Sequence, residues 1–177
     1  MIPKMTFLLP IITFLLTSFC LHAQDSAASL TIRGDVQKPV QWSVEELKTK
    51  FAGQAQEIKF TAGKDKEMKV GTGIPLPAVI ETAGLKTDQG IKHHNLTFLV
   101  IVEAADSYRV FFSMAELAPQ LGQAQAWLIW SVDGKPLSGK EAPLRLVVPS
   151  DKSVDRQIYG INKITLVDGI KLANQLK

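Results

Sequence analysis

A nearly continuous apolar run from Leu96 to Val102 is the feature that most constrains the fold of this chain. The run is rich in β-branched residues and too short for a typical helix, so it predicts a β-strand. Because polar residues do not alternate through it, we expect this strand to be covered on both faces. The segment from Tyr108 to Phe112 follows after a short turn and is its expected hairpin partner.

Other strand-like segments are short and are separated by turn signals. They cover residues 30–33, 57–61, 68–70, 126–132, 144–148 and 161–167, with Val40 and Trp42 continuing an edge strand. Ser43 and Glu46 form a capping box that predicts a helix to about Phe51, and Ser113 and Glu116 form a second one.

A further helix is predicted around Pro75, because Leu76, Val79, Ile80 and Ala83 are spaced for one apolar face and Gly84 suits its end. Residues 170–176 are expected to be a short tail. The helices lack regular βαβ spacing. The sequence therefore predicts an α+β domain with a mixed, largely antiparallel sheet and short helices.

The N-terminus has the pattern of a secretory signal peptide. Lys4 precedes a run without charge from Met5 to Leu21, and Ala23 offers a small residue for cleavage. We expect cleavage after Ala23, a flexible lead over residues 24–29, one domain over residues 30–177, and an exported protein that is periplasmic or secreted. No later segment is apolar enough to cross a bilayer, so no membrane association is expected after cleavage.

Composition limits the chemistry of the exported part. The chain has one cysteine, Cys20, which lies in the signal segment, so the mature protein has no thiolate and no disulfide. The formal net charge of the whole chain is +3, and removal of Lys4 leaves +2. Such a small, scattered excess of positive charge does not indicate a nucleic-acid partner.

No motif identifies a catalytic residue or a metal ligand. His93 and His94 are adjacent, so in an extended segment they point to opposite faces, and we expect solvated loop histidines there. The glycines at positions 71 and 73 lack the third glycine and the lysine of a phosphate-binding loop.

Arg145 stands among apolar strand residues, with Asp151, Asp155 and Arg156 close behind it. A buried guanidinium needs an anionic or carbonyl partner, since leaving it unpaired is costly. Two interpretations remain open: a salt bridge that fixes a loop, or a site where Arg145 or Arg156 holds a phosphate or carboxylate.

Several segments, in order, resemble the molybdopterin-binding domain of the sulfite-oxidase-like oxidoreductases. The likeness is carried by Gly73-Ile74-Pro75-Leu76, Ala105-Asp106-Ser107-Tyr108, the segment 113–117, Asp133-Gly134-Lys135-Pro136-Leu137, the segment 143–149 with Asp151, and Arg156 with the segment 161–167. It spans about residues 30–168. The resemblance implies an α+β fold, molybdopterin or a pterin-like molecule as the ligand, and a redox setting.

The sequence departs from that family at its metal ligand. Catalytic members bind molybdenum through a cysteine in the strand region before the helix, where this chain has Phe60-Thr61-Ala62-Gly63. Threonine and alanine do not replace a soft thiolate. The signal also lacks the twin arginines that accompany export of folded, cofactor-loaded enzymes.

The leading hypothesis is therefore a non-catalytic binding module for a pterin-like or other small anionic ligand, or an accessory to a periplasmic redox partner. Arg145, Asp151 and Arg156 are the expected ligand-facing residues, with Asp106 and Tyr108 in a neighbouring turn. One alternative is a molybdenum-dependent oxidoreductase with a non-cysteine ligand set. Another is a structural or interaction protein that kept the fold without the ligand.

Overall fold

The computed structural model describes residues 29–63, 65–122 and 124–177. The expected signal peptide, most of the flexible lead and Lys64 of the charged turn lie outside these ranges. Within them the elements are β1 (Ser29–Gly34), β2 (Val40–Ser43), α1 (Val44–Lys50), β3 (Gln56–Ala62), β4 (Glu67–Pro75), α2 (Leu76–Glu81), η1 (His94–Thr97), β5 (Phe98–Ala104), β6 (Arg109–Ser113), α3 (Met114–Leu117), β7 (Trp127–Val132), β8 (Lys135–Pro136), η2 (Gly139–Glu141), β9 (Arg145–Val147), β10 (Ile161–Asp168) and α4 (Gly169–Gln175). No helix of the described residues is long and apolar enough to span a membrane.

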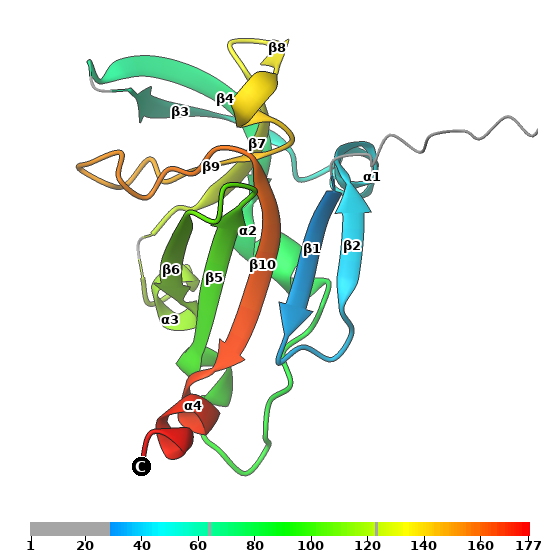
Figure 1. Ribbon diagram of the computed structural model, residues 1–177, viewed down its shortest axis with the longest axis vertical. Coiled ribbons are helices and arrows are strands. Elements are labelled where there is room, and N and C mark those ends of the chain that lie inside the picture. The colour runs from blue at the N-terminus through cyan, green and yellow to red at the C-terminus, as the bar shows by residue number, and fades with distance from the viewer. Residues whose placement is uncertain (1–28, 64, 123) are drawn as a thin grey trace, which may run out of the picture.

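The strands form two five-stranded sheets (Figure 1). The first sheet has the order β2-β1-β10-β5-β6, and only its β1–β10 pair is parallel. The second sheet has the order β3-β4-β7-β8, with β9 also pairing with β7, and all of its pairs are antiparallel. The predicted α+β class with mixed, largely antiparallel pairing is confirmed, although two sheets replace the single one that the sequence suggested.

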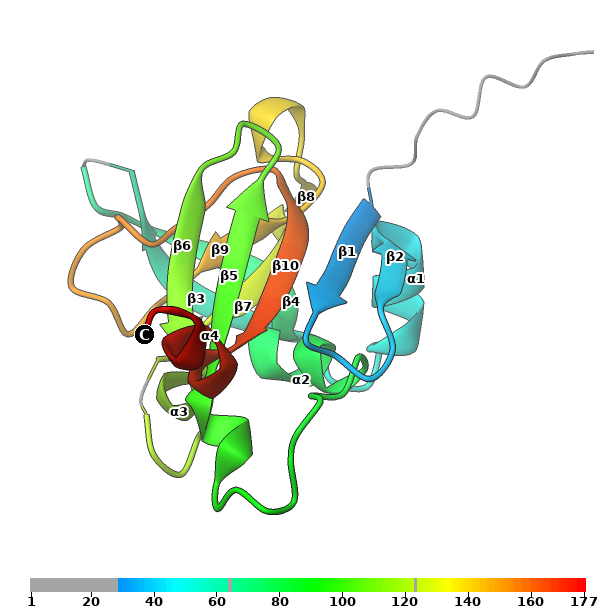
Figure 2. The same cartoon turned by 60° about the horizontal axis from the view of Figure 1, so that its bottom comes forward.

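The main hydrophobic core lies between the two sheets. Figure 2 shows the first sheet in front of β4, β7 and β9. Alternate residues of each central strand enter this core, as the period of two in a strand requires. The core joins Ile32, Val100, Val102, Ile164 and Leu166 of the first sheet to Ile74, Leu128, Leu144 and Leu146 of the second, together with apolar residues of α1 and α2.

The start of α1 and the end of α2 lie where local sequence signals predicted them. Ser43 and Glu46 make both hydrogen bonds of a capping box at the start of α1. The predicted apolar face of α2 is buried, and Gly84 follows it with a φ of 62°, a left-handed conformation that favours glycine. β4, however, continues through Gly71 and Gly73 to Pro75. A side chain at Gly73 would approach Leu128 O to 2.1 Å, so the glycine lets β4 lie close to β7.

Three expectations are wrong in detail. β5 begins at Phe98, because Leu96 and Thr97 belong to η1, and only one of its faces is buried. The other face, which includes Leu99 and Ile101, is partly exposed because no described element covers this side of the first sheet along its full length (Figure 2). The expected C-terminal tail is helix α4, capped by Asp168.

We predict that Ile164→Ala lowers the free energy of unfolding by about 2–5 kcal/mol, because it leaves a cavity between the sheets. The neighbouring Thr165 points to the partly exposed face, so Thr165→Ala should cost about 1 kcal/mol or less. Chemical denaturation followed by circular dichroism measures both variants. Equal losses would contradict the assignment of the two faces.

Candidate functional site

Alternation along β9 places Arg145 on the side of the second sheet that faces away from the main core. Leu144 and Leu146 enter the main core, whereas Val147 belongs to a smaller cluster with Phe60 and Ile129. Arg145 is one residue from each leucine, so it shares the face of Val147. The guanidinium of Arg145 therefore lies on the face of the second sheet that points away from the main core.

The guanidinium of Arg145 lies between two aromatic rings. Its central carbon is 4.9 Å from the ring centre of Phe60 on β3 and 4.4 Å from that of Tyr159. Only 3% of the residue is exposed. Contacts of a cation with two ring faces recover part of the solvation lost on burial.

The hydrogen-bond donors of the Arg145 guanidinium are only partly paired. One terminal nitrogen, Nη2, donates to the side-chain oxygen of Gln157 at 2.7 Å, and the other, Nη1, is 3.4 Å from Glu141 Oε1. The buried Nε has no hydrogen-bond partner among the described residues. Burial lowers the pKa of Arg145, and the electrostatic influence of the neighbouring Tyr159 and Glu141 side chains opposes this only in part. An incompletely paired buried cation is costly for a protein unless a further group completes it.

Arg145 lines a hollow of about 390 Å³ between the β3–β4 turn, the end of β7 and the segment before β9. This is within the usual range for small-ligand pockets, roughly 300–1,000 Å³. We call it the Arg145 pocket. Its other described lining residues are Ala62, Gly63, Asp65, Glu67, Lys69, Val132, Asp133, Glu141 and Tyr159.

Gln157 connects Arg145 to the strand region where the resembled family carries its metal-binding cysteine. Its side-chain nitrogen donates to the main-chain oxygen of Thr61 at 2.6 Å, while its oxygen accepts from Arg145. Gln157 therefore links Arg145 to β3 at Thr61, within the segment of residues 60–63.

Asp151 and Arg156 form a separate cluster. The guanidinium of Arg156 makes two hydrogen bonds to the carboxylate of Asp151, at 2.7 and 2.6 Å, and a third to Glu116 on α3 at 2.5 Å. It also lies 4.8 Å from the ring centre of Phe112. Glu116 was predicted to complete the second capping box, but its carboxylate binds Arg156, while Ser113 still accepts from the amide of Glu116. This geometry is that of an ion-paired cluster fixing a loop against α3 and β6.

Asp106 and Tyr108 lie in the turn between β5 and β6. The carboxylate of Asp106 accepts from the amide of Tyr108 at 3.0 Å, and the Tyr108 hydroxyl donates to the carbonyl of Asp155 at 2.9 Å. Of the five predicted ligand residues, only Arg145 lines the Arg145 pocket.

Sequence reasoning missed three residues that surround Arg145: Glu141, Gln157 and Tyr159. Gln157 and Tyr159 flank the buried Ile158, which forms a β-bridge with Leu146. The alternation of polar, apolar and aromatic residues indicates that the side chains of Gln157 and Tyr159 lie on the same side of their segment. The sequence does not show that this side faces Arg145.

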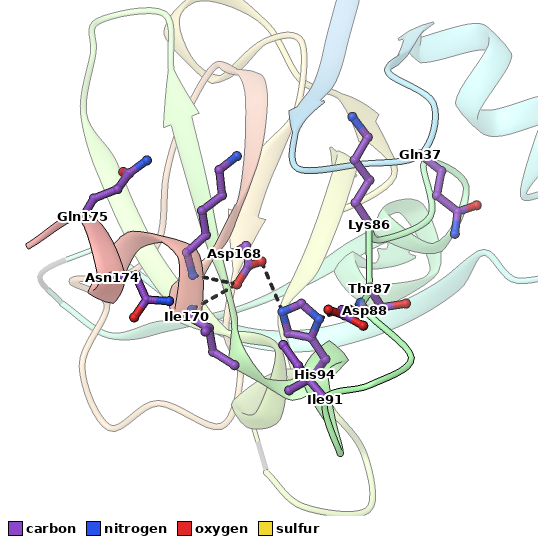
Figure 3. Close-up of a pocket in the computed structure, with 11 residues that line it drawn as sticks. Gln37, Lys86, Thr87, Asp88, Ile91, His94, Asp168, Ile170, Asn174 and Gln175 are labelled. Atoms are coloured by element: carbon purple, nitrogen blue, oxygen red, sulfur yellow. Dashed lines mark hydrogen bonds and ion pairs between the residues drawn. The ribbon is translucent and has the colours of Figure 1, made fainter.

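A second hollow, of about 720 Å³, lies between α4 and the loop before η1 (Figure 3). His94 forms part of its wall and is only 5% exposed, so the expectation of a solvated loop histidine is wrong for this residue. His94 Nδ1 accepts from the amide of Asp88 at 2.8 Å, and His94 Nε2 is 3.1 Å from a carboxylate oxygen of Asp168.

Both nitrogens of His94 thus face groups of the protein itself, and Asp168 also caps α4 through the amides of Ile170 and Lys171. This arrangement ties the loop to the C-terminal helix. Among the described residues, no cluster of three or more histidine, cysteine, aspartate or glutamate side chains has the arrangement of a metal site.

The family model described as "oxidoreductase molybdopterin binding domain" matches residues 21–175. Among solved structures, the sulfane dehydrogenase SoxCD from Paracoccus pantotrophus is similar, with a TM-score of 0.60 and 20% sequence identity over 79% of this chain. The match spans 38% of the SoxCD chain, and at this identity it shows the fold alone. No curated protein sequence matches the chain.

The His94–Asp168 contact generates a prediction for acid stability. Partial burial raises the pKa of Asp168, but hydrogen bonds from the amides of Lys171 and Ile170 and the close approach of His94 outweigh it, so the pKa is lowered. A carboxyl whose pKa is lower in the folded state stabilises the fold above its unfolded pKa of about 4, and this contribution is lost as pH falls further.

Asp168→Asn keeps a helix cap but removes the charge. We expect it to lower the free energy of unfolding at pH 7 and to have a progressively smaller effect below pH 4. Urea unfolding from pH 7 to pH 3 measures this, with Asp106→Asn as a control in a surface turn. A difference from the unsubstituted protein that stays constant with pH would contradict the assignment.

Proposed function

Because the chain belongs to the oxidoreductase molybdopterin-binding domain family, we propose that it is a non-catalytic member that binds a small molecule in the Arg145 pocket. The ligand we envisage is pterin-like or another small molecule that presents an acceptor or anionic group to Arg145. The observation that carries the proposal is the guanidinium itself, which is almost fully buried, lines the pocket and has an Nε without a partner among the described residues.

The complete molybdenum cofactor does not fit the residues of this pocket. Its metal needs a soft protein ligand beside the dithiolene, and the hydroxyl-bearing Thr61 stands in the corresponding strand region. The main-chain oxygen of Thr61 is bound by Gln157.

A pterin-like ring without metal is more compatible with these groups. Its amino and ring N–H edge donates hydrogen bonds, which carboxylates accept, and its keto oxygen can accept from a guanidinium. Tyr159 offers an aromatic surface that is only half-buried. We further propose that the protein acts outside the cytoplasm, on the pattern of its first 23 residues.

Titration with 6-carboxypterin, followed through the fluorescence of the pterin, tests the proposal. We expect saturable binding by the unsubstituted protein and at least a tenfold weaker affinity for Arg145→Gln, since a charge-assisted hydrogen bond contributes about 1.5–3 kcal/mol. Arg33→Gln is the matched control, because Arg33 is exposed on β1 and does not line the pocket.

If Arg145→Gln does not fold, Tyr159→Leu removes the half-buried aromatic ring beside Arg145 and should also weaken binding. Circular dichroism of each variant separates loss of binding from loss of fold. Absence of saturable binding to the folded, unsubstituted protein, or equal binding by all variants, would contradict the proposed role of the pocket.

A further inference from the structure

β6 is an outer strand of the first sheet, because it pairs with β5 on one side and with no described strand on the other (Figure 2). In an antiparallel pair, every second residue directs its main-chain N–H and C=O away from the neighbouring strand. The Ala104 amide donates to the carbonyl of Tyr108, and the same register places Val110 in a hydrogen-bonded pair with β5. Arg109 and Phe111 therefore direct their main-chain groups outward.

The outward main-chain groups of Arg109 and Phe111 have no hydrogen-bond partner among the described residues. The nearby loop of residues 149–156 contacts the β6 region through Tyr108 and Phe112. By the alternation of a strand, these two side chains point to the side of the sheet that faces the core. The contacts of the loop therefore lie on the core side of β6 and not along its edge.

The opposite face of β6 is apolar at its centre. Phe111 is 57% exposed, its cross-strand neighbour on β5 is the partly exposed Ile101, and Leu99 follows on the same face. The charge of Arg109 is paired within the chain with Glu103. An edge strand with an exposed aromatic ring, and with its one charge already paired, is a template for a further strand.

The other described edge strands differ from β6. β3 exposes Glu57 and Lys59, and its Thr61 carbonyl is bound by Gln157. β2, β8 and β9 have four, two and three residues. Exposed charges, covering groups and short length all disfavour pairing with another chain. β6 is therefore the described edge that is best suited to pairing.

We propose that two copies of this chain associate by pairing their β6 strands antiparallel about a two-fold axis at Phe111. This inference goes beyond the proposed function and does not depend on it. A second copy fits because the strand is its own complement in this register. Phe111 lies opposite Phe111 of the second copy and Arg109 opposite Ser113, so no like charges face each other. The outward N–H and C=O of each Phe111 then bond to those of the other copy.

Sedimentation velocity of the purified protein over a range of concentrations tests the dimer. We expect a reversible monomer–dimer equilibrium, because two short strands bury less area than a permanent dimer interface does. Phe111→Lys sets two like charges opposite each other and should weaken association about tenfold or more. Met68→Lys is the matched control, because it makes the same kind of change at an exposed apolar residue on β4 and should leave association unchanged.

Phe111→Pro separates main-chain pairing from side-chain contact. It removes the N–H that points away from β5, a position where an edge strand tolerates proline, so the monomer should keep its fold by circular dichroism. Association should nevertheless fall as it does for Phe111→Lys. In the unsubstituted protein, hydrogen exchange followed by NMR should show slower exchange of the Phe111 amide at higher protein concentration, with no change in the amides of β3.

A monomer at every concentration would overturn the inference. A dimer that Phe111→Pro leaves intact, or in which the Phe111 amide exchanges as fast as in the monomer, would show contact through another surface and would overturn it as well. Because hydrogen exchange is measured on the unsubstituted protein, it decides the matter even if a variant does not fold.

Discussion

The burial of one positive charge at the second sheet organises the surrounding structure. Arg145 begins β9, and the leucines on either side of it, Leu144 and Leu146, are buried in the main core. Its side chain cannot turn toward the core without burying the charge among apolar residues. Phe60, Tyr159 and Gln157 come from two other segments and meet at the guanidinium, so the charge also fixes the segment after β9 against β3.

Arg145 and Arg156 were predicted together as ligand-facing residues, but their guanidinium groups differ in how completely they are paired. Arg156 has two carboxylates at short distances, so its charge is satisfied by the protein, and this raises its pKa, with Asp151 as the main cause. Arg145 has one amide oxygen and one distant carboxylate. An added anionic group would therefore gain more at Arg145 than at Arg156, because the guanidinium of Arg145 has fewer close partners.

Much of the fold could be predicted from local patterns. The alternation of apolar residues identified the strands, and Ser43 and Glu46 located the start of α1, because these signals act within a few residues. The site was predicted less well. The burial of Arg145 could be predicted because the arginine stands among apolar strand residues. Glu141, Gln157 and Tyr159 could not, because their contacts depend on how distant segments pack, and burial of His94 depends on Asp168 in the same way.

This chain has the fold of a molybdopterin-binding domain, and we propose that it binds a small molecule without the metal. The most direct test is to purify the protein from the envelope fraction of its native host and to measure molybdenum by elemental mass spectrometry, with pterin fluorescence after acid release. We expect molybdenum far below one atom per chain, with or without a pterin. Molybdenum close to one atom per chain would contradict it and would require a ligand set that includes no cysteine of the mature chain.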